Sequence, residues 1–402
     1  MTEPRSLHHG APTPPSAPVG DIAAMAEQAG LRRVHIVAWR DLEDPEAGGS
    51  ELHAATVARL WAEAGVQVSM RTSSFEPQSS VVSRDGYAVI RKSGRYLVFP
   101  RTALSGGLRR TGPWDGLVEI WNGMPFLSPL WARCPRIVFL HHVHAEMWRM
   151  VLPPGLARMG HLIEHRLAPP FYRRTPVVTL SESSRREIVD MLGLPAGNIH
   201  VVRPGVDRRF GPGVQERSRH PLVVAVGRLV PVKRFDVLID ALVGLRDRHP
   251  GLEAVIVGEG YERPALEARI DAAGARGWLS LPGHVTDAEL VALYRRAWVV
   301  ASSSAREGWG MTLTEAAACG TPAVATDIAG HRDAVVDGVS GLLASPPSLA
   351  DRLDDVLSNE VLRERLSRGA RRTAAELTWE ATARGTMAVL SAEALRRRAA
   401  GR

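Results

Sequence analysis

Residues 301–325 read ASSSAREGWGMTLTEAAACGTPAVA, and this segment carries the clearest structural signal in the chain. The apolar, β-branched residues 298–300 predict a strand that ends where the segment begins. A loop with Gly308 and Gly310 follows, and the spacing of Met311–Cys319 is helical up to the glycine and proline that end the helix. Ala-Val-Ala then begins a second strand, so the segment is typical of a parallel α/β sheet.

The backbone amides of residues 308–311 lie at or near the start of this predicted helix. Unpaired N–H groups and the helix dipole favour an anion at such a position. Two carboxylates, Glu307 and Glu315, flank the amides with seven residues between them. Spacing alone favours a structural role for both, because glutamate is electrostatically favourable in a first helical turn and common in loops.

The composition is that of a soluble protein, because the 402 residues are 45% hydrophobic and 23% charged. This length predicts two domains, each with its own core. Residues 1–20 lack an apolar signal sequence, and no apolar run reaches the roughly 18 residues that span a bilayer. Cys134 and Cys319 are far apart in the sequence and fit a reducing compartment. We therefore expect a cytoplasmic protein in which residues 1–30 form a disordered tail with at most a short helix, Asp21–Ala29.

The net charge of +7 allows three kinds of acidic partner: nucleic acid, an anionic membrane or a phosphate-bearing substrate. The chain shows no nucleic-acid-binding module, so nucleic acid is not expected as a partner. A solvated basic surface is the simplest interpretation, and peripheral contact with the inner membrane surface is the alternative. Residues 146–174 are basic and amphipathic, which favours a core-packed helix with an exposed basic side and leaves anionic lipid or a lipid-linked acceptor as the alternative contact.

Strands and helices alternate through the first half of the chain. Arg33–Trp39 is a predicted strand, a polar loop ends in Gly48-Gly49, and a helix follows from Ser50. A glycine pair before a helix can bind phosphate through backbone N–H groups, although such pairs are more often structural. Further strands are predicted at 66–68, 87–90, 96–99, 117–120, 136–140, 177–180 and 199–202.

Three histidines, His141, His142 and His144, follow the predicted strand at 136–140. Parallel α/β sheets bind ligands at the carboxyl ends of their strands, so contact with a ligand is one interpretation. Surface or core histidines are the simpler interpretation, and a metal site would need further ligands at suitable geometry.

The alternation restarts after a predicted linker at 203–212. It predicts a second parallel sheet covered by helices on both faces. Arg228 and Lys233 lie five residues apart after the first strand of this sheet, where they could be ordinary loop cations. The strands are predicted at 222–226, 254–257, 279–281, 298–301, 323–325 and 338–343, and long helices at 348–375 and 379–398.

Five motifs together resemble those of the retaining, family-4-type (group 1) glycosyltransferases. Glu307-Gly308-Trp309-Gly310 is similar to the family's EG-aromatic-G sequence, and LTEA at 313–316 and CGTP at 319–322 follow it. The GRL-x-x-x-K pattern of the family is present at 227–233. The family's NGVD linker is matched at 203–207, except that Arg203-Pro204 replaces its asparagine.

The resemblance implies the GT-B fold, in which two Rossmann-like, doubly wound parallel-sheet domains face a cleft. Residues 31–205 would be the acceptor domain, residues 206–378 the nucleotide-sugar domain, and residues 379–402 a helix that packs back on the first domain. The implied reaction moves a hexose from a GDP- or UDP-linked sugar to a hydroxyl acceptor with retention of configuration. A glycolipid, a polysaccharide or a small metabolite fits as acceptor, and residues 71–110, where acceptor recognition is expected, carry no pattern that identifies it.

The resemblance also assigns roles to single residues. Arg228 and Lys233 would clamp the donor diphosphate. Glu307 would bind hydroxyl groups of the donor sugar, and Glu315 would bind the ribose. The other implied donor contacts are His141 (with His142 in reserve), Gly48, Gly49, Val285, Gly308, Trp309, Gly310, Met311 and Thr312.

No Asp-x-Asp metal signature is present, so fixed cations are expected to neutralise the leaving diphosphate, and neither a metal nor another cofactor is expected. Two alternatives are a sugar-nucleotide epimerase of the same architecture and a nucleotide-sugar-binding protein without activity. Such epimerases lack the Glu-x7-Glu and GRL-x-x-x-K pair. Intact Arg228, Lys233, Glu307 and Glu315 argue against a degenerate site.

Overall fold

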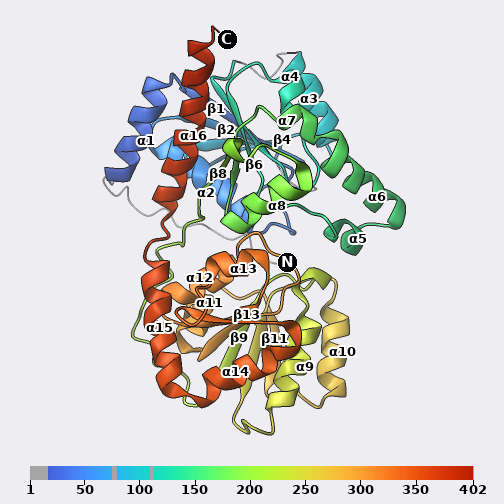
Figure 1. Cartoon of the computed structure of the whole chain (residues 1–402), viewed down its shortest axis with the longest axis vertical. Coiled ribbons are helices and arrows are strands. Elements are labelled where there is room, and N and C mark those ends of the chain that lie inside the picture. Colours follow the sequence, from blue (N-terminus) through green and yellow to red (C-terminus); the bar gives the residue numbers. More distant parts are fainter. Residues whose placement is uncertain (1–16, 75–78, 109–112, 402) are drawn as a thin grey trace.

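The computed structural model describes residues 17–74, 79–108 and 113–401, which form two α/β units stacked along the long axis of the molecule (Figure 1). The first unit is built on an eight-stranded sheet of order β3-β4-β2-β1-β5-β6-β7-β8. All neighbouring strands in this sheet are parallel except the β3–β4 hairpin. The strands are β1 (Arg33–Val37), β2 (Gln67–Thr72), β3 (Val81–Arg84), β4 (Tyr87–Arg91), β5 (Gly116–Ile120), β6 (Arg136–Phe139), β7 (Val177–Thr179) and β8 (Ile199–Val201).

The second unit is built on a six-stranded sheet of order β11-β10-β9-β12-β13-β14, in which all pairs are parallel. Its central strands are short apolar runs buried on both faces, as parallel sheets covered by helices require. The strands are β9 (Leu222–Val226), β10 (Glu253–Val257), β11 (Leu279–Gly283), β12 (Val299–Ser302), β13 (Ala323–Thr326) and β14 (Gly341–Ala344). Two doubly wound units confirm the fold class expected from the sequence.

Helices cover both sheets, and those of the second unit follow its strands in turn. The first unit contains α2 (Gly49–Glu63), α3 (Val98–Gly107), α4 (Ser128–Trp131) and α8 (Glu182–Leu192) besides the segment at 147–172 described below. The second contains α9 (Phe235–Leu245), α10 (Arg263–Ala272), α11 (Asp287–Arg296), α12 (Met311–Ala318), α13 (Ala329–Ala334), α14 (Leu349–Ser358) and α15 (Glu360–Ala374).

The last helix, α16 (Trp379–Ala399), leaves the second unit and packs on the first, as expected. Figure 1 shows it beside α1 (Ala17–Gln28), the first helix of the chain. The indole N–H of Trp61 in α2 donates a hydrogen bond of 2.9 Å to the carbonyl oxygen of Ala383 in α16. The core of the first unit therefore contains residues from both ends of the chain.

The short helix expected at Asp21–Ala29 is present as α1, which begins earlier, at Ala17. The expectation of a disordered tail is wrong for these residues, because Ile22 and Ala26 are buried in the core shared with α16; residues 1–16 lie outside the described part of the chain. The expected strand at 96–99 is instead the start of α3, in which Val98 and Thr102 face the core at helical spacing.

Residues 146–174 were expected to form one amphipathic helix and are divided into several pieces. These are α5 (Met147–Val151), α6 (Pro154–Leu162), a π-helical turn (Ile163–Leu167) and α7 (Pro169–Tyr172). Proline pairs begin two of the pieces, because proline cannot continue a helix from the preceding turn. Figure 1 shows α5 and α6 projecting from the side of the first unit.

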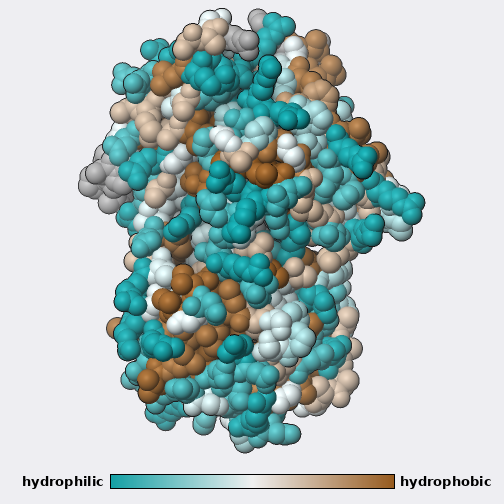
Figure 2. Space-filling model, viewed as in Figure 1, coloured by the Kyte–Doolittle hydropathy of each residue, from teal (hydrophilic) through white to brown (hydrophobic). Residues whose placement is uncertain are grey.

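In the described ranges, no helix is both long and apolar enough to cross a bilayer. Figure 2 shows hydrophilic residues over much of both units on the face it presents, with hydrophobic areas between them.

The packing of α16 on the first unit predicts a difference between two leucines of this helix. Leu390 is fully buried, so Leu390→Ala is expected to lower the free energy of unfolding by about 2–5 kcal/mol. Leu395 is 39% exposed on the same helix, so Leu395→Ala is expected to cost less than about 1 kcal/mol. Urea denaturation of both variants measures the difference, and equal losses would show that α16 is not part of the core.

Candidate active site

Two helices from different units begin at the same place. In α2 of the first unit the first residue is Gly49, and in α12 of the second it is Met311. A Cβ atom added to Gly49 would lie 2.9 Å from the sulfur atom of Met311. The predicted glycines Gly48 and Gly49 and the predicted segment 308–312 are therefore brought together. The positive ends of both helix dipoles meet here, which favours an anion between them.

The loop that precedes α12 is shaped by close backbone contacts. A Cβ atom on Gly308 would lie 2.5 Å from the carbonyl oxygen of His141 at the end of β6. Gly310 caps the helix with φ of 114°, a conformation that favours glycine. On the other side, a Cβ atom on Gly330 in α13 would lie 2.5 Å from the carbonyl oxygen of Glu307. Sequence reasoning gave no role to Gly330, because its partner lies in another loop.

Glu307 and Lys233 form an ion pair with 2.5 Å between the carboxylate and the ammonium nitrogen. Burial alone would raise the pKa of Glu307, but the charge of Lys233 brings it down to about 2. The hydroxyl group of Ser304 donates a further hydrogen bond of 2.8 Å to the same carboxylate oxygen. Glu307 is thus an anion at every pH at which the protein would be used.

Hydrogen bonds join the two backbone segments that carry this ion pair. Ser303 donates its hydroxyl hydrogen to the carbonyl oxygens of Lys233 and Arg234, at 2.9 and 2.8 Å. The amide of Ala305 donates to the carbonyl oxygen of Val232 at 2.8 Å. The 3₁₀ turn Pro231–Lys233 and the Glu307 loop therefore hold their positions relative to each other.

Arg228 lies beside the start of α2 without a partner of opposite charge. Its Nε atom is 3.9 Å from the position of a Cβ atom on Gly48, so it reaches across to the first unit. Within the described residues no carboxylate is close enough to form an ion pair with it, and the side chain is exposed. Of the two predicted clamp cations, Lys233 is paired and Arg228 is available to an anion.

Both candidate histidines lie next to the Glu307 loop. The Nε2 atom of His141 is 3.2 Å from Nδ1 of His53, and its own Nδ1 is buried with no hydrogen-bond partner. Burial lowers the pKa of His142 to about 4, and the charge of Glu307 acts against this shift. The assignment of the sugar contact to His141 therefore stays a prediction, with His142 as the alternative.

The remaining predicted donor residues are Glu315 and Val285. Burial raises the pKa of Glu315 to about 7, although the hydrogen bond of 3.1 Å from the Tyr294 hydroxyl acts in the opposite direction. Val285 is half-buried directly after β11, at the same edge of the sheet as the other loops. Glu315 is therefore a carboxyl group that changes its charge near neutral pH.

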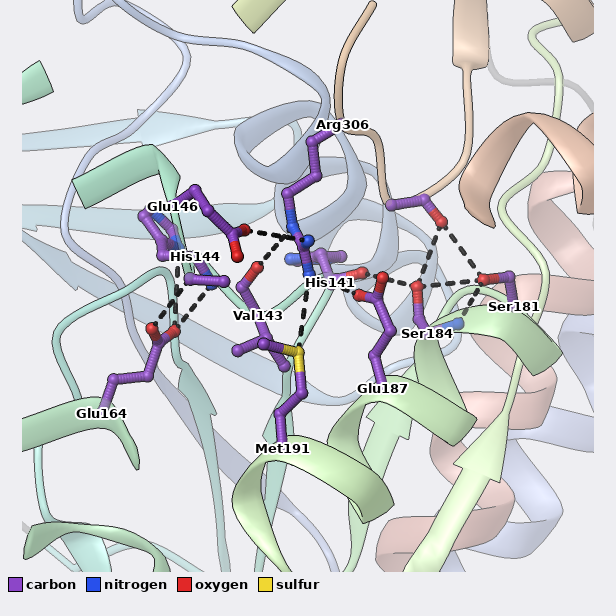
Figure 3. A network of polar contacts seen from close by, with 12 residues as sticks. His141, Val143, His144, Glu146, Glu164, Ser181, Ser184, Glu187, Met191 and Arg306 are labelled. Carbon is purple, nitrogen blue, oxygen red and sulfur yellow. Dashed lines mark hydrogen bonds and ion pairs between the residues drawn. The ribbon is translucent and has the colours of Figure 1, made fainter. Parts of the chain in front are cut away.

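Contacts between the units hold the Glu307 loop from the other side (Figure 3). The guanidinium group of Arg306 donates to the carbonyl oxygen of Val143 at 3.0 Å and to the carboxylate of Glu187 at 2.7 Å. The hydroxyl groups of Ser181 and Ser184 each lie 3.3 Å from the carbonyl oxygen of Gly308. Sequence reasoning missed these residues, because each acts on a loop of the other unit.

Two further groups complete the site. Asp333 in α13 accepts hydrogen bonds from the amides of Glu182 and Ser183 at the start of α8, at 3.2 and 3.3 Å. Buried His331 lies 2.8 Å through Nδ1 from the carbonyl oxygen of Thr326, and burial lowers its pKa. A neutral ring that donates from Nδ1 leaves Nε2 to accept from the Ser302 hydroxyl at 3.2 Å.

No three His, Cys, Asp or Glu side chains converge to hold a metal ion in the part of the chain that the structure describes. The arrangement offers a fixed anion, Glu307, which is paired with the ammonium group of Lys233 in the loop that leads into α12. Such a site can bind a polar ligand that carries both hydroxyl groups and an anionic group.

Comparison with known families matches both halves of the chain. Residues 47–210 match the model "Glycosyltransferase Family 4", and residues 210–373 match the model "Glycosyl transferases group 1". A D-inositol 3-phosphate glycosyltransferase of Jonesia denitrificans is 30% identical over an alignment of 390 residues that covers 86% of this chain and 91% of the relative. A glycogen synthase of Mycobacterium tuberculosis is 32% identical over 264 residues, 63% of this chain and 62% of that protein.

Solved structures share the same architecture. Sucrose-phosphate synthase from Thermosynechococcus elongatus superposes with a TM-score of 0.77 at 18% identity, over 92% of this chain and all of that one. Anabaena HepE in complex with UDP-glucose superposes with a TM-score of 0.69 at 18% identity, over 91% of this chain and 99% of that one. At this identity the structures support the fold.

The contact of Gly330 with the Glu307 loop predicts the effect of adding one methyl group. Gly330→Ala is expected to cost about 1–3 kcal/mol, because the new Cβ atom must displace backbone atoms of residues 307 and 309. Gly244 in α9 has open space around its Cβ position, so Gly244→Ala is expected to stabilise the protein by up to about 1 kcal/mol. Thermal denaturation compares the two variants. An equally stable Gly330→Ala protein would contradict the close contact.

Proposed function

The chain belongs to the group 1 glycosyltransferases of family-4 type, and from that premise we propose that it moves a hexose from a nucleotide diphosphate sugar to a hydroxyl acceptor with retention of configuration. Its relatives are glycosyltransferases, which makes this chain a transferase of the same general class. The observation that carries the proposal is the ion pair of Lys233 and Glu307 in the loop that leads into α12, whose first residue, Met311, lies against Gly49 at the start of α2.

The chemistry needs negative charge to be stabilised on the leaving group. When the bond between the sugar and the nucleotide breaks, charge develops on the diphosphate, and fixed donors stabilise it in the transition state. Arg228, Lys233 and the N-termini of α2 and α12 are the groups we assign to this task. On donor binding, Lys233 would turn from Glu307 towards the diphosphate, and Glu307 would accept hydrogen bonds from sugar hydroxyl groups.

Retention is proposed from the resemblance to the family, and the described residues include no side chain that stands out as a covalent nucleophile. Glu307 is held by Lys233 and Ser304 and is the fixed partner of the sugar hydroxyls in our proposal. We therefore propose a same-face displacement, in which the leaving phosphate takes the proton of the acceptor hydroxyl. A metal is not part of the proposal, because the fixed cations and helix ends supply the charge.

Of the two candidate leaving nucleotides, UDP and GDP, we propose UDP. The Anabaena HepE structures contain UDP-glucose or UDP, and their fold is that of this chain. GDP is the alternative, because the backbone segment around Val285 that would meet the base gives little side-chain discrimination.

We also propose that the protein works at the cytoplasmic face of the inner membrane. Three apolar side chains of α6, those of Leu156, Met159 and Leu162, are 46–49% exposed on a segment that also carries Arg158. An apolar and basic helix surface of this kind favours an anionic lipid surface. Sedimentation with anionic vesicles tests the contact, and Leu156→Ser together with Met159→Ser is expected to abolish it; unchanged sedimentation would contradict the proposal.

Donor binding is the first test of the proposed function. Calorimetry with UDP, GDP, ADP and their common sugars, with and without EDTA, is expected to show binding of one nucleotide class that EDTA does not weaken. Loss of binding in EDTA would contradict the role of fixed cations, and failure of all nucleotides to bind would contradict the transferase proposal.

Lys233→Ala is expected to lower kcat by about 10²–10³-fold, because it removes a cation from the developing charge of the diphosphate. Lys233→Arg keeps the charge and is expected to retain more activity than the alanine variant. Steady-state rates of donor hydrolysis measure both. Arg186→Gln, an exposed change on α8, is the matched control and is expected to be neutral. Near-normal kinetics of Lys233→Ala would contradict the clamp.

The raised pKa of Glu315 predicts a pH dependence of donor affinity. The ribose would donate hydrogen bonds to the carboxylate, and protonation below about pH 7 removes acceptor capacity. UDP-glucose affinity is therefore expected to fall about tenfold from pH 8 to pH 6. The sugar nucleotide suits the test because its diphosphate lacks the terminal group that titrates near pH 6 in UDP. In Glu315→Gln the affinity is expected to be lower and independent of pH; a dependence that persists would exclude Glu315 as its source.

A further inference from the structure

A second basic pocket lies on the first unit, apart from the Lys233–Glu307 pair. It has a volume of about 350 Å³ and lies between the end of β2, the loop after β4, and α3. Three cations line it: Arg71, Lys92 and Arg101. The apolar side chains of Leu104 and Leu108 line it as well and are more than half exposed.

Arg71 is the unusual member of this group. The residue is only 5% exposed, and its Nε atom is buried with no hydrogen-bond partner. Its Nη1 atom donates a hydrogen bond to the hydroxyl group of Ser105. No carboxylate in the described ranges forms an ion pair with it, and burial together with the nearby charge of Arg101 lowers its pKa.

Other arginines of the first unit differ from Arg71 in that they form ion pairs. Arg40 and Arg91 follow or end strands at the carboxyl edge of the sheet, and the Arg84 side chain reaches from β3 to the carboxylates that also bind Arg91. Each of the three forms ion pairs with carboxylates. Those carboxylates belong to Asp41, Glu43, Glu46 and Glu51. A buried cation without a partner is costly, because it loses hydration and gains no ion pair in return. Stability alone gives no reason for Arg71 to remain at this position.

The pocket lies at the edge of the sheet that leads to the candidate active site. Arg71 is near the carboxyl end of β2, and its carbonyl oxygen accepts a hydrogen bond of 2.9 Å from the amide of Ala38. Two residues later, Arg40 forms an ion pair of 3.3 Å with Glu51 in the first turn of α2. Ligands of α/β sheets bind along this carboxyl edge.

We propose that Arg71, Lys92 and Arg101 bind a phosphate group, and that the acceptor carries it. The identification with the acceptor rests on the proposed function, whereas the phosphate site does not. Arginine offers a planar fork of N–H donors and lysine a point charge, and both bind phosphate oxygens. Leu104 and Leu108 provide apolar contact beside the phosphate, so either a soluble phosphate monoester or a lipid phosphate fits.

The chain itself provides a selective probe. Its only lysines are Lys92 and Lys233, one in each proposed anion site. Reductive methylation with ¹³C retains the charge of lysine and gives one NMR signal from each side chain. Glycerol 3-phosphate is expected to shift the Lys92 signal, and UDP-glucose the Lys233 signal.

Two variants test the pocket by stability. Arg71→Met is expected to be at least as stable as the wild type in phosphate-free buffer, because it removes an unpaired buried cation. Glycerol 3-phosphate is expected to raise the Tm of the wild type, and this rise is expected to vanish in Arg71→Met and to shrink in Arg101→Gln, an exposed change that leaves the core intact.

Arg372→Gln is the matched control. It removes one positive charge from an exposed arginine cluster on α15, which consists of Arg365, Arg368, Arg371 and Arg372. It is expected to keep the full rise in Tm. Equal responses of the wild type, Arg71→Met and Arg101→Gln would overturn the proposal and show that phosphate binds the basic surface at large.

The source of the phosphate is decided by a parallel binding experiment. Phosphatidylcholine vesicles with and without phosphatidic acid are compared with glycerol 3-phosphate. Binding that depends on phosphatidic acid and on Arg71 would identify a lipid phosphate, and binding of glycerol 3-phosphate alone a soluble one. Failure of both ligands would overturn the site.

The two proposals fail separately in the NMR experiment. A Lys92 shift without a Lys233 shift would support the phosphate pocket and contradict the donor site. The opposite pattern would overturn the pocket and leave the transferase proposal intact.

Discussion

The ion pair between Lys233 and Glu307 is the interaction on which the site depends. A partly buried carboxylate is stabilised by a cation beside it, and Lys233 supplies one at 2.5 Å. The pair keeps its geometry because the 3₁₀ turn at 231–233 is joined to the Glu307 loop by hydrogen bonds from Ser303 and Ala305. A shift of either loop would separate two partly buried charges, so the position of the pair depends on the contact between these loops.

The same loop also depends on the first unit. Arg306 precedes Glu307 and donates to Val143 and Glu187, while the carbonyl oxygen of Gly308 lies against the hydroxyl groups of Ser181 and Ser184. The orientation of the units and the geometry of the loop are therefore coupled, because the loop is bound from both. The return of α16 to the first unit strengthens this coupling, since one helix then belongs to the core of the first unit and is continuous with the second.

Sequence reasoning located elements and loops correctly where their signal lies in neighbouring residues. The strand, glycine loop and helix of 298–319 and the pattern at 227–233 carry their information locally, and the structure brings their side chains together. The contacts of Gly330 and Arg306 were not predicted, because each is made with a loop that is distant in the sequence. The place of α1 in the core was missed for the same reason, because its partner α16 lies more than 350 residues further along the chain.

The arginines of this chain differ in whether a carboxylate lies beside them, and this difference indicates which of them stabilise the fold and which are available to a ligand. In the first unit, Arg40, Arg84 and Arg91 are paired with carboxylates, and these pairs fix loops. Arg71 and Arg228 have no such partner among the described residues, yet both lie where anions can approach. A nearby carboxylate would increase the contribution of an arginine to the stability of the fold. The same carboxylate would weaken the binding of an anionic ligand by that arginine. The positive net charge of the chain is therefore most informative at the cations that have no partner among the described residues, and it is to these cations that our proposals assign the phosphate groups of donor and acceptor.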